Sequence, residues 1–488
     1  MTEDTRQQIK PDICVIGAGP GGLAAASAAA AFGVNVVLIE KAKMGGESLN
    51  SGALPSKALL AAAERAQILR NGGWRNSGWR NGARPGANFS AYAAARDHVR
   101  DVIAAVAPQD SRERFTGLGV RVLDGAGRFT DRTTVKVNGF DVKSRRFIIA
   151  TGSSPVVPAI PGLADTPHLT NETVFDLADC PRHLIVIGAG SVGLELAQAF
   201  RRLGAEVTVL EAAMPLADED AECAGIVLDA LARDGIVVRS GVEVAQVRRA
   251  LARVQVDIVT TAGEQHRKET IEGTHLLVAA GRRPNLENLD LDAAGIRYQP
   301  NGIVVDRRLR TSNKQVYAIG DVTDGPRSTQ LANHHAGLVI RHALFRTAVR
   351  ADLLAVPRVT FTDPELAQVG LVEDEARAHS GIIRVLRSAY RDNDRAQATG
   401  ATDGHIKVIT DRRGDILGAT IVGAGAAENI AAWTLAINQK LNIGAMAGVI
   451  VPYPTYAEVG KHAAMTYFTR GLTSPLVHRI IGLLRRFG

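Results

Sequence analysis

The sequence predicts an α/β fold that contains two similar βαβ units and ends in a smaller α+β region. A glycine-rich turn between a buried strand and an apolar helix occurs near residue 17 and recurs near residue 188, which predicts the two units. Two apolar segments joined by a short polar turn near residue 413 predict a β-hairpin in the last region. A chain of 488 residues has room for about three domains.

The composition is that of an ordinary globular protein. Apolar residues make up 46% of the chain and charged residues 22%, which excludes a disordered, collagenous or coiled-coil protein. The 57 Lys and Arg residues exceed the 50 Asp and Glu residues, but they are scattered, and the net charge is only +7. We therefore expect no nucleic-acid partner.

Three cysteines, Cys14, Cys180 and Cys223, are too few for a disulfide scaffold. They form no C-x-x-C pair and no zinc-type cluster with histidine, so we expect no metal site and interpret each cysteine as a small buried apolar residue. Few cysteines suit a reducing compartment. The charged start MTEDTRQQIKPD lacks the n-region of a secretory signal, and we expect a cytoplasmic protein.

The stretch Ile13–Ile39 has 27 residues without a charge, which is long enough to span a membrane. Five glycines and a proline interrupt it. We therefore predict a strand at Asp12–Ile16, a helix at Gly21–Phe32 and a second strand at Asn35–Ile39, which form a soluble βαβ unit.

The turn of this first unit has the pattern G-x-G-x-x-G at Gly17, Gly19 and Gly22. In such a turn the first glycine allows the tight bend, the second lets a pyrophosphate approach the backbone, and the third lets helix and strand pack closely. The helix N-terminus then offers free N–H groups to the phosphates. Glu40 follows Gly17 by 23 residues and ends the next strand, where it could accept a hydrogen bond from a ribose hydroxyl.

The same pattern recurs in a second unit, with Glu211 again 23 residues after the first glycine. Two plain βαβ units without a ligand are the alternative, but two complete Rossmann-like patterns with equal spacing favour two nucleotide sites. The second unit comprises a strand at His183–Ile187, glycines Gly188, Gly190 and Gly193, a helix at Val192–Leu203 and a strand at Glu206–Leu210.

Glu211 also predicts which dinucleotide the second unit binds. A carboxylate there accepts from a free 2′-hydroxyl and repels a 2′-phosphate. The following segment, Ala212–Ala217, has no Arg or Lys to hold a phosphate. We therefore expect NAD rather than NADP.

Four further segments are Ile149-Ala-Thr-Gly152, Gly281-Arg-Arg-Pro-Asn285, Tyr317-Ala-Ile-Gly-Asp321 and FTDPELAQVG at Phe361–Gly370. With the two glycine turns, they resemble one family along nearly the whole chain. This family is the flavoprotein disulfide reductases, or class I pyridine nucleotide-disulfide oxidoreductases, such as dihydrolipoamide dehydrogenase, glutathione reductase and mercuric reductase.

The resemblance implies FAD in the first unit, NAD(P)H in the second and a homodimer. It divides the chain into a split FAD domain at 1–150 and 282–350, an NAD domain at 151–281 and an α+β dimerisation domain at 351–488, where His405–Thr410 and Ile416–Val422 would form the hairpin. It places Asp321 on the ribityl chain of FAD. Further cofactor-site residues that it implies are Gly46, Ser48, Lys57, Gly127, Thr151, Gly152, Ala332 and Gly281.

The expected redox centre departs from the family pattern. The segment GGESLNSGALPSK, residues 45–57, lies where the family has two cysteines, and it carries Ser48 and Ala53 in their places. Thiol–disulfide exchange needs a thiolate, which neither serine nor alanine provides. We therefore expect no disulfide reduction by the family route.

Two charged residues of the family pattern are present. The resemblance implies that Lys57 pairs with Glu195 beside the flavin N5, where hydride arrives and where a cation would stabilise the anionic reduced ring. The alternative for Lys57 is an ordinary solvated helix lysine.

The C-terminal acid/base pair of the family is altered. Tyr453 stands at the position of a histidine that the partner subunit supplies in those enzymes, and Glu458 follows it. Tyrosine titrates near pH 10 and is a poor general base, although it can donate a hydrogen bond to an acceptor. The alternatives are an interface aromatic for Tyr453 and a capping box, Thr455-x-x-Glu458, for the glutamate.

Three further features lie outside these motifs. His335 and His342 are seven residues, or about 10 Å, apart on a helix, which is too far for one metal ion. A pentapeptide repeat at residues 73–82 predicts either a surface loop or a docking loop through Trp74 and Trp79. The tail at residues 475–488 predicts an amphipathic helix flanked by arginines, which packs on the dimerisation domain or contacts a membrane surface weakly.

Three hypotheses for function remain. The first is an NADH-dependent FAD oxidoreductase that passes electrons directly to a small-molecule acceptor such as a quinone, a dye, oxygen or another pyridine nucleotide. The second is a dithiol enzyme of the dihydrolipoamide dehydrogenase or mercuric reductase type whose cysteines have been replaced. The third is a non-enzymatic flavoprotein that senses NADH.

Overall fold

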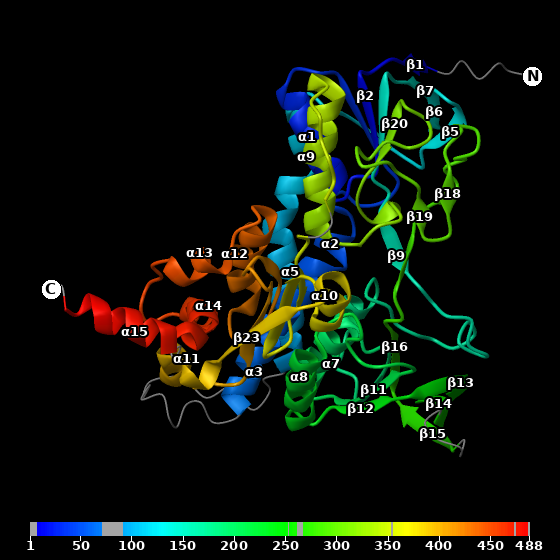
Figure 1. Ribbon diagram of the computed structural model, residues 1–488. Helices are drawn as coiled ribbons and strands as arrows, with labels where there is room; N and C mark the ends of the chain where they lie inside the picture. Colours follow the sequence, from blue (N-terminus) through cyan, green and yellow to red (C-terminus); the bar gives the residue numbers. More distant parts are fainter. Residues whose placement is uncertain are drawn as a thin grey trace, which may run out of the picture.

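A computed structural model describes residues 7–70, 91–251, 253–260, 267–352, 355–472 and 475–486 (Figure 1). The pentapeptide repeat at 73–82 lies outside the described residues. In Figure 1 the first βαβ unit lies at the top, the second at the bottom and the C-terminal domain at the left. Within the described residues, no helix is long and apolar enough to cross a membrane.

The first unit is a five-stranded parallel sheet in the order β20-β8-β2-β3-β4. Helices α1 and α9 pack side by side on one face, as Figure 1 shows. β2 and β3 are almost entirely buried because both faces of the sheet are covered. The elements are β2 (Ile13–Ile16), α1 (Pro20–Ala31), β3 (Val36–Glu40), β4 (Arg121–Asp124), β8 (Arg146–Ile149), β20 (Val316–Ala318) and α9 (Thr329–Phe345).

A second, mostly antiparallel sheet covers the other face of this unit, in the order β1-β7-β6-β5. Phe129 and Phe147 meet edge to face between the two sheets, with ring centroids 5.3 Å apart. The strands are β1 (Gln7–Ile9), β5 (Arg128–Asp131), β6 (Thr134–Val137) and β7 (Phe140–Lys143), and the short pair β18 (Tyr298–Gln299) and β19 (Gly302–Ile303) follows later in the chain.

The second unit has a four-stranded parallel sheet in the order β12-β11-β10-β16, and an antiparallel sheet of β13, β14 and β15 is inserted between β12 and β16. The chain enters and leaves it through β9 (Ser153–Pro155) and β17 (Arg282–Pro284), which pair antiparallel. The remaining elements are η2 (Val174–Asp176), β10 (His183–Ile187), α7 (Ser191–Leu203), β11 (Glu206–Glu211), α8 (Ala221–Arg233), β12 (Val237–Ser240), β13 (Val242–Ala250), β14 (Arg253–Thr260), β15 (Lys268–Gly273) and β16 (His275–Val278).

Helix α3 connects the two units, because it packs on α5 and on α7 of the second unit. Tyr92 of α5 and Phe200 of α7 contact each other there, with ring centroids 6.0 Å apart. The helices of this region are α2 (Gly46–Asn50), α3 (Ala53–Arg70), α5 (Ala91–Val106), η1 (Ala107–Asp110), α6 (Arg112–Gly117) and, after β20, η3 (Gly320–Val322).

The C-terminal domain is a five-stranded antiparallel sheet in the order β21-β22-β25-β24-β23, against which α12 and α14 pack. The predicted hairpin is confirmed, since β24 and β25 pair antiparallel. The elements are β21 (Arg358–Thr360), β22 (Glu365–Gly370), α10 (Glu373–Ser380), β23 (Ile383–Ala389), η4 (Tyr390–Asp392), α11 (Asp394–Thr399), β24 (His405–Asp411), β25 (Ile416–Gly423), α12 (Ala426–Asn438), α13 (Ile443–Gly448), α14 (Ala457–Leu472) and α15 (Pro475–Leu484).

The α/β fold class and both βαβ units are confirmed, with small differences at the element ends. β2 begins at Ile13 because the side chain of Asp12 accepts a hydrogen bond from the Asn35 N–H, 3.3 Å away. Each helix begins one residue before its predicted start. Cys14 and Cys223 are buried as predicted, but Cys180 is only half-buried because it lies in the connection before β10. Burial still raises the pKa of the Cys180 thiol to about 11.

A buried charge network joins the second unit to the C-terminal sheet. Lys407 of β24 has 5% of its side chain exposed, and its Nζ lies 2.8 Å from a carboxylate oxygen of Asp220 and 2.8 Å from one of Glu373. The side chain of Asp220, with 3% exposed, also caps α8 by accepting from the Cys223 N–H. Hydrogen bonds from Arg387 lower the pKa of the neighbouring Glu222 to about 2.

Replacing Lys407 by Met leaves the Asp220 carboxylate buried without its cation, and we expect this to cost about 3–5 kcal/mol of stability. The double variant Lys407→Met, Asp220→Asn should recover much of the loss, because asparagine keeps the helix cap and removes the charge. Urea unfolding followed by circular dichroism measures both. Lys314→Met, at an exposed position, is the control, and equal midpoints for Lys407→Met and this control would contradict the expectation.

Candidate functional site

The two glycine turns have nearly the same geometry. Gly17 has φ +104° and Gly188 has φ +107°, values that L side chains rarely adopt. A Cβ at Gly17 would lie 2.3 Å from the Ala150 carbonyl oxygen, and one at Gly188 would lie 2.4 Å from that of Ala279. Each turn therefore packs directly on the neighbouring strand end and accepts no side chain at this position.

The carboxylates predicted to bind ribose close these turns. One oxygen of Glu40 accepts from the Ala18 N–H at 2.6 Å, and one oxygen of Glu211 accepts from the Ala189 N–H at 2.8 Å. The other oxygen in each case accepts from a backbone N–H two residues further along the chain. A carboxylate has about four acceptor positions, so each can still receive a ribose hydroxyl.

The turns leave room where a pyrophosphate would lie. A Cβ placed on Gly19 or on Gly190 meets no atom within 4 Å, whereas Gly22 and Gly193 pack against the turn itself. Gly19 and Gly190 are the N-caps of α1 and α7, and neither helix has a side-chain cap. The free N–H groups of both helix ends therefore fit the phosphates of two dinucleotides, as FAD and NAD require.

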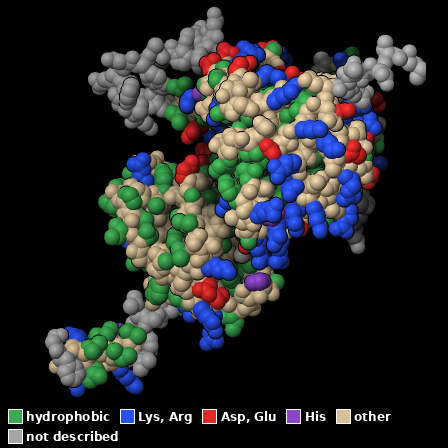
Figure 2. Space-filling view, turned by 90° about the horizontal axis from the view of Figure 1, so that it is seen from above, with side chains coloured by type: hydrophobic (Ala, Val, Ile, Leu, Met, Phe, Trp, Pro, Cys, Tyr) green, Lys and Arg blue, Asp and Glu red, His purple; other side chains and the backbone are tan. Residues whose placement is uncertain are grey.

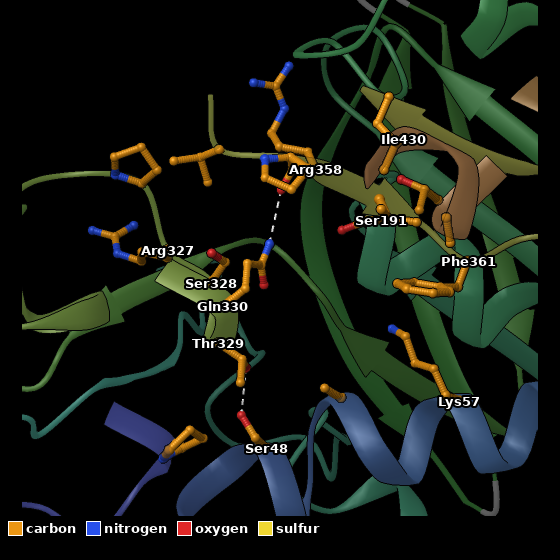
Figure 3. Close-up of a pocket in the computed structure, with 18 of the residues that line it drawn as sticks. Ser48, Lys57, Ser191, Arg327, Ser328, Thr329, Gln330, Arg358, Phe361 and Ile430 are labelled. Atoms are coloured by element: carbon orange, nitrogen blue, oxygen red, sulfur yellow. Dashed lines mark hydrogen bonds between the residues drawn. The ribbon is translucent and has the colours of Figure 1, made fainter. Parts of the chain in front are cut away.

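A cavity of about 1190 Å³ lies where the first unit, the second unit and the C-terminal domain meet. Figure 3 shows side chains from all three parts around it. Its walls include Lys57 of α3, Ser191 of α7, Thr329 of α9, Phe361 after β21 and Ile430 of α12. The cavity is large enough for the ring of a cofactor together with a second small molecule.

Lys57 and Glu195 form an ion pair at this cavity, at 2.7 Å, as the resemblance implied. The Glu195 side chain has 4% exposed, and its second oxygen accepts from the Phe361 N–H at 2.9 Å. The Lys57 ammonium also lies 4.4 Å from the centre of the Phe361 ring. Figure 3 shows the lysine side chain pointing toward that ring. The glutamate is thus held at both oxygens, and it fixes the position of the lysine.

Ser48 and Ala53 also line the cavity, and they bring no thiol to it. The hydroxyl of Ser48 is hydrogen-bonded to that of Thr329, with 2.7 Å between the oxygens. A dashed line marks this bond in Figure 3. The three cysteines are free, and none of them lines this cavity. The place of the expected redox disulfide is therefore occupied by a hydroxyl pair and a methyl group.

A polar cluster that the sequence did not predict lies behind Ser48. Arg282 contacts Glu47 at 3.3 Å and donates to Ser153, whose hydroxyl donates to Asp321 at 2.8 Å. Burial raises the pKa of Glu47, and Arg282 opposes that rise. Arg282 and Asp321 belong to segments that carry the family resemblance, and Glu47 stands between the motif positions Gly46 and Ser48, but the sequence did not predict that they meet.

The remaining predicted cofactor residues have different structural roles. Gly46 packs on Gly19, because a Cβ on it would lie 2.7 Å from the Gly19 Cα. Thr151 and Asn285 exchange hydrogen bonds of 2.9 Å between the two crossing segments. Among the others, Gly152 and Gly281 have positive φ, Ala332 packs against Gly21 and Gly320, and Gly127 packs against Ile16, Ile39 and Val135.

Tyr453 and Glu458 do not line this cavity in the same chain. Tyr453 has 72% of its surface exposed and donates to Asp394 at 2.7 Å, a hydrogen bond that raises the pKa of the tyrosine. Glu458 accepts from the Thr455 N–H at 3.1 Å, which is one half of the predicted capping box. The other half is replaced, because the Thr455 hydroxyl donates to the Pro452 carbonyl.

His335 and His342 each make a hydrogen bond within the fold. His335 accepts from the Gly320 N–H at 3.3 Å, and burial lowers its pKa to about 4. The ring of His342 is hydrogen-bonded to the Tyr317 hydroxyl at 2.8 Å. Among the residues described, no group of three or more His, Cys, Asp or Glu side chains is placed to hold a metal ion.

In the FAD-loaded protein that the resemblance implies, replacing Lys57 by Met should slow hydride transfer from a nicotinamide nucleotide by at least about tenfold, because the cavity loses its cation and the buried Glu195 loses its partner. Stopped-flow absorbance of the bound flavin measures the rate. Arg65→Met removes a cation from an exposed position of the same helix and should leave the rate unchanged. A normal rate in Lys57→Met protein that retains its flavin would refute this role.

Comparison with known proteins gives matches along most of the chain. The pyridine nucleotide-disulphide oxidoreductase model matches residues 11–336, and the dimerisation-domain model of the same name matches residues 356–464. Residues after 464, which include α15, follow the matched region.

Two curated relatives and one solved structure illustrate the similarity. A mercuric reductase of Bacillus cereus is 33% identical over 461 residues, which cover 93% of this chain and 71% of the relative. A dihydrolipoyl dehydrogenase of Thermus scotoductus is 36% identical over 459 residues, covering 93% and 96%. The HOCl-induced flavoprotein disulfide reductase RclA from Escherichia coli superposes with a TM-score of 0.81 at 26% identity, covering 93% of this chain and 99% of RclA.

Proposed function

The chain belongs to the pyridine nucleotide-disulphide oxidoreductase family, and from that premise we propose that it is an NADH-dependent FAD oxidoreductase with a non-disulfide acceptor. Members of the family are NAD(P)H-dependent flavoproteins. FAD, when bound, would supply the redox chemistry by accepting a hydride and releasing electrons to a small molecule such as a quinone, a dye, oxygen or another pyridine nucleotide.

The observation that carries this proposal is the absence of sulfur from the cavity walls. The Ser48 hydroxyl is bound to Thr329, Ala53 has no reactive atom, and the cysteines lie elsewhere. Exchange with a disulfide needs a thiolate at this place. The chain's own residues instead provide a fixed cation, Lys57, and an open cavity into which a second molecule can enter.

Anaerobic titration of the FAD-loaded protein with NADH and then dithionite tests the proposal. We expect about two electrons per subunit, because FAD is the only redox group. NADH oxidation should proceed with a quinone, oxygen or NADP but not with lipoamide, glutathione disulfide or mercuric ion. Uptake of about four electrons, or a thiolate charge-transfer band, would rule out the proposal.

The double variant Ser48→Cys, Ala53→Cys separates the proposal from an inactivated dithiol enzyme. If the protein is a dithiol enzyme whose cysteines have been replaced, the double variant gains disulfide or mercuric-ion reduction. The unsubstituted chain then oxidises NADH with none of the acceptors above. Ser56→Cys, on the same helix as Ala53, is the matched control. A chain that binds NADH without reducing its flavin would instead indicate an NADH sensor.

The preference for NADH rests on Glu211, which lies at the end of β11 beside the second glycine turn. Glu211→Arg should lower kcat/KM for NADH and raise it for NADPH, each by at least about tenfold, because a cation there attracts a 2′-phosphate. Steady-state kinetics with both nucleotides measures the change. Glu206→Arg, at the exposed start of the same strand, is the control, and unchanged selectivity in Glu211→Arg would refute the assignment.

The proposal includes a homodimer, a cytoplasmic location and the domain limits 1–150 with 282–350, 151–281 and 351–488. Apolar side chains on the outer surface of the C-terminal domain support the dimer, since Ile450 is 93% exposed and Leu435 is 60% exposed. A second copy would cover them. The roles of Tyr453 and Glu458 in the reaction are part of the same proposal, because both lie on this domain rather than in the cavity of their own chain.

A further inference from the structure

Helix α15 (Pro475–Leu484) has an apolar face that is largely exposed among the described residues. Figure 1 shows it extending from the end of α14, away from the body of the chain, and Figure 2 shows the same segment set apart from the rest of the surface. Ile480 and Ile481 are each 47% exposed, Leu483 is 55% exposed and Leu484 is 61% exposed. An isolated helix gains nothing from such a face unless something covers it.

The face is continuous and its borders are basic. At about 100° per residue, the apolar positions from Val477 to Leu484 occupy an arc of about 160°, and Arg479 and Arg485 lie on either side of it. Arg486 lies on the polar side. Long arginine side chains at such borders can keep their charges in water while the apolar residues between them are buried.

All charged side chains in residues 459–488 are basic. After Glu458 the sequence has no acidic residue, while it has five basic ones: Lys461, Arg470, Arg479, Arg485 and Arg486. In a symmetric dimer, two copies of this helix that paired with each other would bring equal charges together. An anionic surface is complementary to the helix, and a second copy of it is not.

From this apolar face with basic borders, we propose that α15 docks the protein on the surface of an anionic phospholipid bilayer. The helix would lie in the plane of the interface, with Ile480, Ile481 and Leu484 among the acyl chains and the arginines at the phosphate groups. The proposal concerns where the protein is held, and it stands whichever acceptor oxidises the flavin.

Vesicle flotation with the full-length FAD-loaded protein tests the docking. We expect the protein to float with vesicles of phosphatidylcholine and phosphatidylglycerol at low salt, and to stay behind with vesicles of phosphatidylcholine alone. Rising salt should weaken the binding, because the arginine contribution is screened. Failure to float with the anionic vesicles, or equal binding to both kinds, would overturn the proposal.

Two double variants separate the apolar contribution from the charge contribution. Ile480→Glu, Leu484→Glu should abolish flotation, and Arg485→Gln, Arg486→Gln should weaken partitioning by roughly 30-fold and flatten its salt dependence. Leu251→Glu, at a 96% exposed leucine of the second unit, and Arg100→Gln, at an exposed arginine of α5, are matched controls that should bind like the natural chain. NADH oxidation with a water-soluble acceptor should be the same in all of them.

Sedimentation without lipid tests the alternative that a second copy of the chain, and not a bilayer, covers the apolar face of α15. If the glutamate variant floats like the natural chain but changes its oligomeric state, α15 is a contact between copies and the lipid proposal is wrong. If the variant keeps the oligomeric state and loses flotation, the lipid proposal is supported. Circular dichroism of each variant confirms that the remainder of the chain is folded.

Discussion

The ion pair between Lys57 and Glu195 holds the three parts of this protein around one cavity. Lys57 belongs to α3 of the first unit, Glu195 to α7 of the second, and the Phe361 N–H that completes the glutamate's partners belongs to the C-terminal domain. A carboxylate with 4% of its side chain exposed is stable only when both oxygens are satisfied. The closure of the cavity and the position of its cation therefore depend on the same few contacts.

The cavity keeps the electrostatic part of the family's site and lacks its sulfur chemistry. The lysine, its glutamate and both glycine turns are in place, so a hydride donor and a flavin have matching sites. At the position of the expected redox disulfide, the Ser48 hydroxyl is hydrogen-bonded to the Thr329 hydroxyl, and neither can pass electrons to a disulfide. Under the proposed function the acceptor reaches the cavity directly, and the cavity is wide enough to admit a small molecule.

The two βαβ units share the same glycine turn and strand-end glutamate, and they differ in the residues around the turn. In each, the glutamate at the strand end accepts a hydrogen bond from the N–H beside the first glycine, so the turn and the carboxylate proposed to accept a ribose hydroxyl are held together. The first unit adds the cluster of Glu47, Arg282 and Asp321, which connects the turn region to the crossing strands. The second adds the buried pair of Lys407 and Asp220, which anchors it on the C-terminal sheet.

The sequence alone determined the local features: both glycine turns, the glutamates 23 residues beyond them, the C-terminal hairpin and the lack of thiols at Ser48 and Ala53. These follow from short-range geometry and residue identity, and the resemblance added the pairing of Lys57 with Glu195. Only the tertiary structure decided that Phe361 holds Glu195, that Glu47 meets Arg282, that Cys180 is half-exposed and that α15 has an uncovered apolar face. A periodic pattern shows which side of an element is apolar, but the element that covers it comes from a distant part of the chain, and only packing brings the two together.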